Sequence, residues 1–431
     1  MARAVVLGGY GLIGSACMRA LAEAGFDVIG MGRNERAARQ VIPQAEWLIR
    51  DLTRVDTHEW RKILRGVDVV VNAAGALQES ARDDLSGIHE TMAMRLVSAL
   101  EGSSARLVQI SAAGVSEDAS TEFFRSKARG DAAIQASGVR WVILRPTLVL
   151  SPSAYGGTAL LRAAAALPMV SPAILPAAQI QTVFVDDLAQ AVVHAARGEV
   201  ASGTIADITE KGSRSLPETV DALRRWLGFP APRLRLPIPV AGLWLLSRMA
   251  DGLGWLGWRS PLRSNAIHAL QGGVRGNPAT WEAAGGSACR SLEDSLATLP
   301  STLQERWFAR AYLMFPIMIA LLSFFWLSSG IVALIGFDAA QRLLVEHGVG
   351  GATANIIIAG GALADMALGA ALLWRPWTRH ACLGMILLSV AYLIGGTIVA
   401  PDLWADPAGP FVKVLPGTGL ALVALGLANE R

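Results

Sequence analysis

The stretch that decides the fold is Ala4-Val5-Val6-Leu7-Gly8-Gly9-Tyr10-Gly11-Leu12-Ile13-Gly14, near the start of the 431-residue chain. Four apolar residues lead into a G-x-G-x-x-G pattern at Gly9, Gly11 and Gly14, and residues 15–24 follow with a helical pattern. Glycines at this spacing permit a tight turn and let the backbone approach a pyrophosphate at the helix N-terminus. Because the pattern lies between a strand and a helix, it predicts a dinucleotide-binding turn rather than a plain tight turn.

Further short apolar runs follow this turn, each rich in Val, Ile or Leu and each separated from the next by a helical pattern. They cover residues 27–31, 47–49, 67–72, 107–110 and 142–144. Continuous apolar runs are typical of strands buried on both faces, and their alternation with helices predicts a doubly wound parallel sheet. We therefore expect an α/β dinucleotide-binding domain over residues 1–210. Residues 211–300, which are less regular, are expected to form a small substrate-side subdomain.

The end of the second predicted strand indicates which dinucleotide binds. An acidic residue about 20 positions after the glycines would hold the ribose 2′-hydroxyl of NAD. The chain instead has Gly32-Arg33, with Arg36 nearby. A guanidinium there suits a 2′-phosphate, which predicts NADP(H), with NAD(H) as the alternative. Asp51, after the third strand, is expected to bind the adenine amino group or to be an ordinary loop carboxylate.

The last third of the chain has the composition of a membrane domain. Residues 311–336 and 381–400 carry no charge, residues 352–374 carry only Asp365, and each run is long enough to span a bilayer. Residues 414–428 are shorter, but a four-helix bundle agrees best with the flanking charges. Arg306, Arg310, Arg375, Arg379 and Arg431 then fall on one side, and Arg342 and Lys413 on the other. The positive-inside rule predicts a multi-pass protein of the inner (cytoplasmic) membrane with both termini cytoplasmic, whereas three spans would place the C-terminus outside.

Composition excludes several other classes. Hydrophobic residues make up 52% and charged residues 17%, which rules out a disordered chain and argues against a wholly soluble one. A net charge of +3 is too small to indicate nucleic acid as a partner. The three cysteines are Cys17, Cys289 and Cys382, and their spacing predicts neither a disulfide framework nor a metal site.

Residues 1–210 resemble the short-chain dehydrogenase/reductase superfamily in its extended or atypical branch, in the style of the NmrA-like proteins and the nucleotide-binding accessory subunit of respiratory complex I. The matching residues are Gly8-Gly9-Tyr10-Gly11-Leu12-Ile13-Gly14, Asp51-Leu52, Asn72-Ala73-Ala74-Gly75, Ile110-Ser111-Ala112, Ser126-Lys127, Arg145-Pro146 and Val185-Asp186-Asp187. Residues 301–431 resemble a DoxX-like four-helix membrane domain. Its cues are Gly361-Ala362-Leu363-Ala364-Asp365, Pro401-Asp402-Leu403-Trp404-Ala405-Asp406-Pro407 and Lys413-Val414-Leu415-Pro416.

The resemblance implies a set of site residues. Those expected to bind the cofactor are Gly8, Gly9, Gly11, Leu12, Ile13, Gly14, Arg33, Asp51, Leu52, Ala73, Ala74, Gly75 and Lys127. In the superfamily a lysine holds the nicotinamide ribose, a serine orients the substrate, and a tyrosine four residues before the lysine is the acid/base. Lys127 and Ser111 match, but the tyrosine position holds Phe123, which has no proton to exchange. Tyr155 is the candidate replacement acid, with an ordinary loop tyrosine as the alternative.

Two further features leave alternatives open. Residues 238–258 are apolar and tryptophan-rich, so they are expected either to lie at a membrane surface or to pack as a buried helix. Asp365 lies near the middle of the second predicted span, where a charge is costly. It is expected to be a proton, ion or quinone-headgroup site, or else a structural acid bonded to a neighbouring helix.

These observations support three hypotheses about function. The first is a membrane-anchored NADP(H)-dependent oxidoreductase acting on a small lipid-soluble substrate, such as a quinone or hydrophobic carbonyl compound. The second is a non-catalytic NADP(H) sensor or assembly factor with a membrane-protein partner, which Phe123 favours. The third, a transporter regulated by its nucleotide-binding part, ranks last because four short spans with one acid offer little for a pathway.

Overall fold

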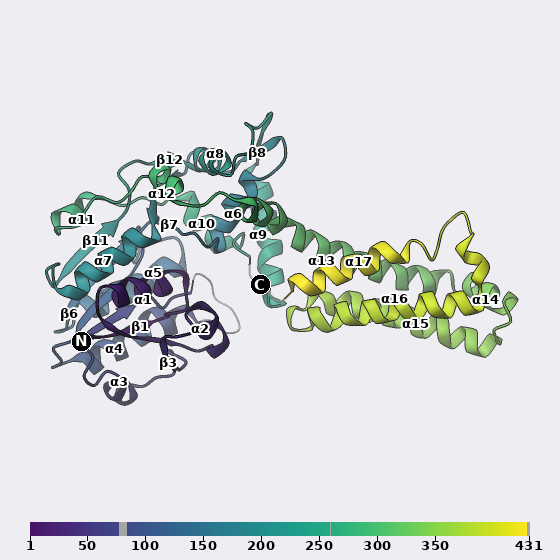
Figure 1. Ribbon diagram of the computed structural model, residues 1–431, viewed down its shortest axis with the longest axis horizontal. Helices are drawn as coiled ribbons and strands as arrows, with labels where there is room; N and C mark the ends of the chain where they lie inside the picture. The colour runs from purple at the N-terminus through teal and green to yellow at the C-terminus, as the bar shows by residue number, and fades with distance from the viewer. Residues whose placement is uncertain (77–83, 259, 429–431) are drawn as a thin grey trace. The chain divides into compact units, whose positions relative to one another are not determined.

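The computed structural model describes residues 1–76, 84–258 and 260–428. The chain forms two compact units (Figure 1). Unit 1 comprises Met1–Asp251 and Ser260–Ala309, and unit 2 comprises Gly252–Arg259 and Arg310–Arg431. The three-part division at residues 210 and 300 stays a prediction.

Unit 1 is built on a parallel sheet of seven strands in the order β11-β6-β5-β4-β1-β2-β3. The strands are β1 (Arg3–Leu7), β2 (Asp27–Gly32), β3 (Glu46–Ile49), β4 (Val69–Asn72), β5 (Arg106–Ile110), β6 (Arg140–Pro146) and β11 (Thr204–Ile208). From the adjacent pair β1 and β4, the chain adds β2 and β3 on one side and β5, β6 and β11 on the other. The prediction of a doubly wound parallel sheet is therefore confirmed. In such a sheet the ligand crevice lies beyond the carboxyl ends of the strands where the order reverses, here between β1 and β4.

Helices cover both faces of this sheet. On one face lie α1 (Leu12–Glu23) and α7 (Val185–Arg197). On the other lie α3 (Thr57–Ile63), α4 (Met92–Leu100) and α5 (Glu122–Gln135). Successive residues of β1 explain the two cores, because Val6 packs on the first face while Val5 and Leu7 pack on the second. A short helix, α2 (Glu35–Val41), follows β2, and a π-helical turn (Gly87–Thr91) precedes α4.

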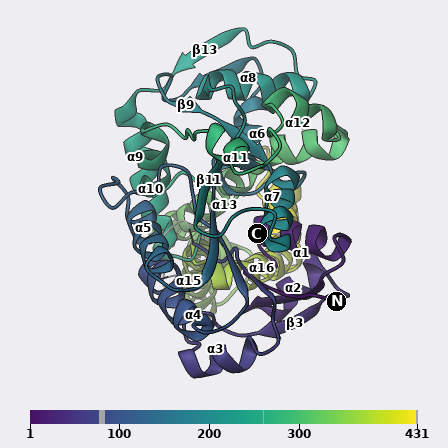
Figure 2. The ribbon, with the colours of Figure 1, turned by 90° about the vertical axis from the view of Figure 1, so that its left-hand side faces the viewer.

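The remaining elements of unit 1 include α8, α12 and β13, which lie at the top of Figure 2. The helix α9 belongs to them up to Asp251 and continues into unit 2 from Gly252 on. Three two-stranded sheets pair β10 with β7, β12 with β9 and β13 with β8. These strands are β7 (Leu148–Leu150), β8 (Val170–Ala173), β9 (Gln179–Ile180), β10 (Thr182–Phe184), β12 (Arg214–Ser215) and β13 (Leu234–Pro237). The helices are α6 (Gly156–Ala165), α8 (Leu216–Trp226), α9 (Val240–Trp255), α10 (Ser264–Gln271), α11 (Ala279–Ala283) and α12 (Leu292–Thr298).

Unit 2 is all helical. Its elements are α13 (Leu303–Ile335, which begins in unit 1), α14 (Phe337–Glu346), α15 (Gly351–Leu373), α16 (Thr378–Val399) and α17 (Val414–Leu427), with short 3₁₀ turns at Arg375–Trp377 and Pro401–Trp404. Side chains of α13, α15, α16 and α17 share one apolar core. Within the described residues three helices are long and apolar enough to cross a membrane, which indicates a multi-pass membrane protein.

The fourth expected span is present as a helix but is short. The 14 residues of α17 rise about 21 Å, less than the roughly 30 Å hydrocarbon core. The four-span count and the orientation that rests on it stay predictions, and Arg431, one of the charges used for that orientation, lies outside the described residues.

Candidate nucleotide-binding site

The glycine-rich turn lies at the carboxyl end of β1 and is held by backbone hydrogen bonds to β2 and within itself. Backbone N–H groups of Gly8 and Gly9 donate to the Met31 carbonyl at 2.9 and 3.2 Å, and the Gly11 N–H donates to the Gly8 carbonyl at 2.9 Å. Gly8 has φ +70°, and a Cβ on it would lie 2.9 Å from the Ala74 Cα. A Cβ on Gly14 would lie 2.3 Å from the Gly8 carbonyl oxygen. Glycine is therefore required at both positions by the backbone itself.

The helix that follows is suited to an anion. α1 begins at Leu12 after an extended Gly11, no side chain caps its first turn, and that turn carries no acidic residue. The N–H groups of Leu12, Ile13 and Gly14 are thus left without intrahelical partners, and the helix dipole favours negative charge there. This arrangement fits the diphosphate of a dinucleotide.

The loops after β2 and β3, where the adenosine is expected to bind, carry a cation and a carboxylate that already accepts hydrogen bonds. Arg33 is exposed directly after β2, where Gly32 leaves no acid for a ribose hydroxyl. After β3, Asp51 accepts hydrogen bonds from the backbone N–H and the hydroxyl of Thr53 at 3.2 and 2.8 Å, through a single carboxylate oxygen. Its other oxygen lies 3.6 Å from the Arg54 Nε, and the adjacent Leu52 is buried.

The predicted catalytic pair Ser111 and Lys127 lies together, but both groups are engaged within the protein. Lys127 is buried on α5, and its Nζ donates to the Ile110 carbonyl at 3.1 Å. Burial lowers the pKa of Lys127 to about 8, while the nearby Asp131 acts in the opposite direction. The Ser111 hydroxyl donates to Asp131 Oδ2 at 2.6 Å.

Asp131 is the centre of this buried cluster. It is 1% exposed and also accepts a hydrogen bond from the Arg145 guanidinium at 3.2 Å. Burial raises the pKa of Asp131, while Ser111, Lys127 and Arg145 all act to lower it. The Ser111 hydroxyl therefore donates its proton to a carboxylate of its own domain, and its role in orienting a substrate stays a prediction.

Phe123 occupies the tyrosine position one turn before Lys127. Its ring lies 5.7 Å from the Lys127 Nζ and makes an edge contact with His89, whose ring centroid is also 5.7 Å away. The phenyl ring therefore packs between two polar groups without offering them a proton.

His89 is a site residue that the sequence did not indicate. Its Nε2 accepts the Ala76 N–H at 3.3 Å, so Nδ1 carries the proton and donates to the Ser126 hydroxyl at 2.9 Å. Burial, followed by the charge of Lys127, lowers the pKa of His89 to about 2, which keeps the imidazole neutral. His89 thereby links the loop after β4 to α5.

The loop after β4 brings the predicted cofactor residues of different strands together. Asn72 donates from its amide to Gln109 Oε1 at 2.7 Å and accepts the Ala74 N–H at 3.2 Å, which fixes the turn through Ala73 and Ala74. A Cβ on Gly75 would lie 3.8 Å from the Lys127 Nζ. Since a Cβ on Gly8 would also meet Ala74, the glycine turn, the Ala73–Gly75 segment and Lys127 lie close to one another.

Tyr155 lies elsewhere in the fold. It precedes α6 as its N-cap residue, and its side chain is 64% exposed. Within the described residues the structure shows no hydrogen bond from its hydroxyl to Ser111 or Lys127. Its role as a replacement acid stays a prediction. No cluster of metal-ligating side chains occurs in the part of the chain that the structure describes.

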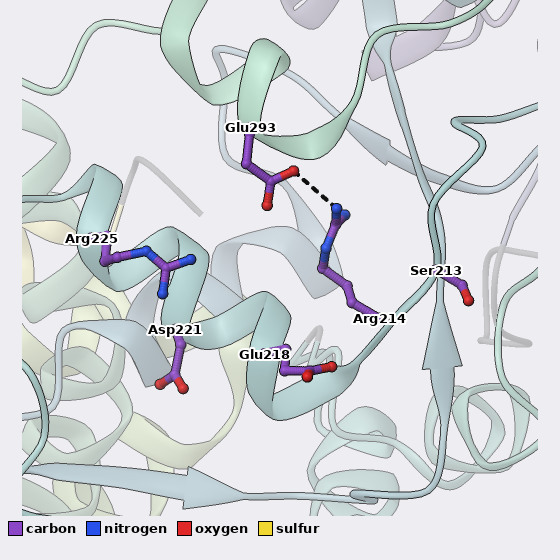
Figure 3. Close-up of a pocket in the computed structure, with 6 residues that line it drawn as sticks. All are labelled: Ser213, Arg214, Glu218, Asp221, Arg225 and Glu293. Atoms are coloured by element: carbon purple, nitrogen blue, oxygen red, sulfur yellow. Dashed lines mark hydrogen bonds and ion pairs between the residues drawn. The ribbon is translucent and has the colours of Figure 1, made fainter.

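A separate polar cavity of about 310 Å³ opens beside α8 (Figure 3). It is lined by Ser213, Arg214, Glu218, Asp221, Arg225 and Glu293, and Arg214 lies 2.9 Å from Glu293 across it. Its residues come from β12, α8, α12 and the loops beside them, so none of the predicted cofactor residues lines it.

Comparisons with known proteins agree with this architecture. Residues 8–191 match the model of an NAD(P)H-binding family, and residues 323–422 match that of the DoxX-like family. The N-terminal part of the chain is therefore similar to NAD(P)H-binding domains, and its C-terminal part is similar to DoxX-like proteins. No curated protein matches it.

Solved structures that resemble the chain share its fold. The Bordetella bronchiseptica enzyme WbmG in complex with NAD aligns with a TM-score of 0.53 and 16% identity, over 70% of this chain and 93% of that one. The UDP-glucose 4-epimerase of Thermotoga maritima, with UDP-glucose, aligns with a TM-score of 0.52 and 14% identity, over 68% and 96%. MoeE5 in complex with UDP-glucose and NAD aligns with a TM-score of 0.52 and 15% identity, over 72% and 100%.

Proposed function

We propose that this protein is a membrane-anchored oxidoreductase that binds NADP(H) and passes a hydride to a lipid-soluble acceptor, such as a quinone or a hydrophobic carbonyl compound. The observation that carries the proposal is the glycine turn between β1 and the uncapped first turn of α1. When bound, NADPH would supply the hydride. The first turn of α1 would hold its diphosphate, and Lys127 would hold its nicotinamide ribose.

The missing tyrosine narrows the class of acceptor. Phe123 has no proton to give, and the Ser111 hydroxyl is engaged by Asp131. An acceptor that draws its proton from water after reduction requires no side-chain acid at this position. Quinones meet that condition better than simple carbonyl compounds, and they are dissolved in the bilayer to which this chain is anchored.

The surface of α9 supports an acceptor that is lipid-soluble. Leu243, Ser247 and Ala250 form its buried face, so α9 is not a wholly buried helix. Trp244, Leu245, Leu246 and Met249 are exposed on the other side, with the Arg248 guanidinium 5.6 Å from the Trp244 ring. An apolar face with tryptophan and arginine is typical of a helix lying in a membrane interface.

Arg33 supports the choice of NADP(H) over NAD(H), which is the nucleotide bound to WbmG and MoeE5. Arg33→Ala should weaken NADPH binding about 10- to 100-fold, or roughly 1.4–2.7 kcal/mol, because a charge-assisted contact with the 2′-phosphate is lost. Its effect on NADH should be within about twofold, well under 1 kcal/mol. Isothermal titration of both nucleotides measures the two affinities, with the exposed Arg19→Ala on α1 as the matched control. Equal losses for NADPH and NADH would refute the assignment.

Turnover tests the reaction itself. Full-length protein in lipid nanodiscs should consume NADPH when a membrane-soluble quinone is added, as followed by the absorbance of the reduced nicotinamide. A hydrophobic aldehyde tests the carbonyl alternative. Lys127→Met should lower the rate by at least about tenfold, since a bound ribose would lose its cation; that loss is roughly 1.4 kcal/mol. Tight binding without consumption of NADPH in either case would favour the second candidate.

That second candidate is a non-catalytic NADP(H) sensor or an accessory factor for a membrane complex. The Ser111–Asp131 hydrogen bond favours this candidate, because the hydroxyl expected to orient a substrate already donates to Asp131. The glycine turn expected to bind the nucleotide is not affected by this hydrogen bond. A sensor would bind NADPH tightly, turn nothing over and copurify with a membrane protein.

The charge distribution supports a cytoplasmic location for the nucleotide domain. Arg306 and Arg310 precede the apolar part of α13, Arg375 lies between α15 and α16, and Arg379 lies in the first turn of α16. Arg342 lies between α13 and α15, on the side expected to be outside. If the chain crosses the inner membrane four times, as proposed, this distribution favours a cytoplasmic position for both the nucleotide domain and the C-terminus under the positive-inside rule.

A further inference from the structure

Asp365 lies at the meeting point of three helices in unit 2. It is the one charged residue of α15, a helix of 23 residues, and it is 4% exposed. The Ser329 hydroxyl of α13 donates to one of its carboxylate oxygens at 2.8 Å. The Tyr392 hydroxyl of α16 donates to the other at 2.9 Å. Each oxygen thus receives a hydroxyl from a different neighbouring helix.

Glycines make this convergence possible. A Cβ on Gly361, one turn before Asp365, would lie 2.8 Å from the Tyr392 hydroxyl. A Cβ on Gly330, next to Ser329, would lie 2.5 Å from the Ala362 carbonyl. Small residues let helices approach closely inside a membrane, and here they bring both hydroxyls onto one carboxyl group.

The charged groups of the surrounding helices lie far along the chain from this point. On α13 they are Glu305, Arg306 and Arg310, the last nearly 20 residues, or roughly 28 Å of helix, before Ser329. On α16 they are Arg379 and His380, 12 or more residues, or roughly 18 Å, before Tyr392.

The helix α14 carries Asp338, Arg342 and Glu346. Its Gln341 side chain donates a hydrogen bond to the Asn355 side chain, which lies ten residues before Asp365 on α15. α17 has no titratable residue.

Asp365 therefore has hydroxyl partners but no counter-ion pair among the interactions that the described residues show. A carboxylate without a cation is costly at membrane depth, whereas a carboxylic acid is not. Ser and Tyr hydroxyls can accept as well as donate a hydrogen bond. When Asp365 is charged, the Ser329 and Tyr392 hydroxyls both donate hydrogen bonds to it. When Asp365 is protonated, one hydroxyl can still donate to its carbonyl oxygen while the other accepts a hydrogen bond from its O–H.

We propose that Asp365, Ser329 and Tyr392 form a proton-binding site within the membrane domain. The carboxylate takes up one proton on one oxygen, and the hydroxyl beside that oxygen turns to accept it. The site is independent of the nucleotide crevice and of the reaction proposed for it.

The test is labelling of the full-length protein in liposomes with a hydrophobic carbodiimide, which modifies protonated carboxyl groups in membranes. Mass spectrometry of the peptide that contains Asp365 is expected to show modification that falls as the pH rises. Asp365→Asn should abolish it. Tyr392→Phe removes a donor to the charged form and should move the half-labelling point upward by about half to one pH unit.

Ser328→Ala is the matched control, because the Ser328 hydroxyl donates to the Phe325 carbonyl and not to Asp365. It should leave the half-labelling point unchanged. Infrared difference spectra of the wild-type protein supply a second readout, since acidification should produce a protonated carboxyl band that Asp365→Asn lacks. Labelling that does not vary with pH, or the absence of both labelling and band, would overturn the proposal.

Discussion

Gly14→Val is expected to abolish nucleotide binding, with NADPH affinity lowered at least about 100-fold, or roughly 2.7 kcal/mol. A Cβ at this position would lie 2.3 Å from the Gly8 carbonyl oxygen and 3.0 Å from the Gly9 Cα. Both contacts are with backbone, so α1 would have to move away from the turn. The N–H groups of its first turn would then no longer point at the diphosphate. Isothermal titration with NADPH measures the loss.

Gly138→Ala is the control for this substitution. Gly138 lies in the same unit, its φ is not in the left-handed region, and a Cβ there meets nothing within 4 Å. It should bind NADPH like the wild-type protein. If Gly14→Val also bound normally while remaining folded, the nucleotide would have to lie somewhere other than the glycine turn.

Glu210→Ala is expected to lower the melting temperature by on the order of 10 °C, corresponding to about 3–5 kcal/mol. Glu210 is 1% exposed and joins three parts of unit 1. It accepts from the Thr182 N–H at 2.8 Å, from the Leu292 N–H at 2.9 Å and from the Arg214 guanidinium at 2.9 and 3.1 Å. Alanine would leave these donors unpaired and Arg214 without its buried partner.

The matched control is Glu293→Ala, because Glu293 pairs with the same Arg214 but its side chain is 58% exposed. An exposed ion pair contributes about 0–1 kcal/mol, so the melting temperature should fall by no more than a few degrees. Thermal unfolding of the full-length protein in detergent measures both variants. Equal effects would show that burial of Glu210 is not what stabilises this part of the fold.

Much of the nucleotide-binding fold could be predicted because its signals are local. Six of the seven strands of the parallel sheet contain a short apolar run, and the Gly8–Gly14 segment carries its strand, turn and helix in consecutive residues. The seventh strand, β11, was not predicted, because Asp207 interrupts its apolar residues. The long apolar runs that form α13, α15 and α16 are equally local signals, because a span needs only length and composition.

The parts that escaped prediction depend on contacts between distant residues. His89 and Ser126 are 37 residues apart, and Ser111 and Asp131 are 20 apart, so no spacing rule joins them. The sequence did hold one signal for Asp131: it is an acidic residue one helical turn after Lys127. The strands β7, β9, β10 and β12 have two or three residues each, too few for a period to be recognised.

Nucleotide titration of the wild-type protein in lipid nanodiscs tests the central claim most directly. The account predicts saturable binding of one NADPH per chain, at least about tenfold (1.4 kcal/mol) tighter than NADH. Equal or tighter binding of NADH would contradict the assignment of Arg33. Failure of both nucleotides to bind would contradict the proposal that this membrane protein works through a phosphorylated dinucleotide.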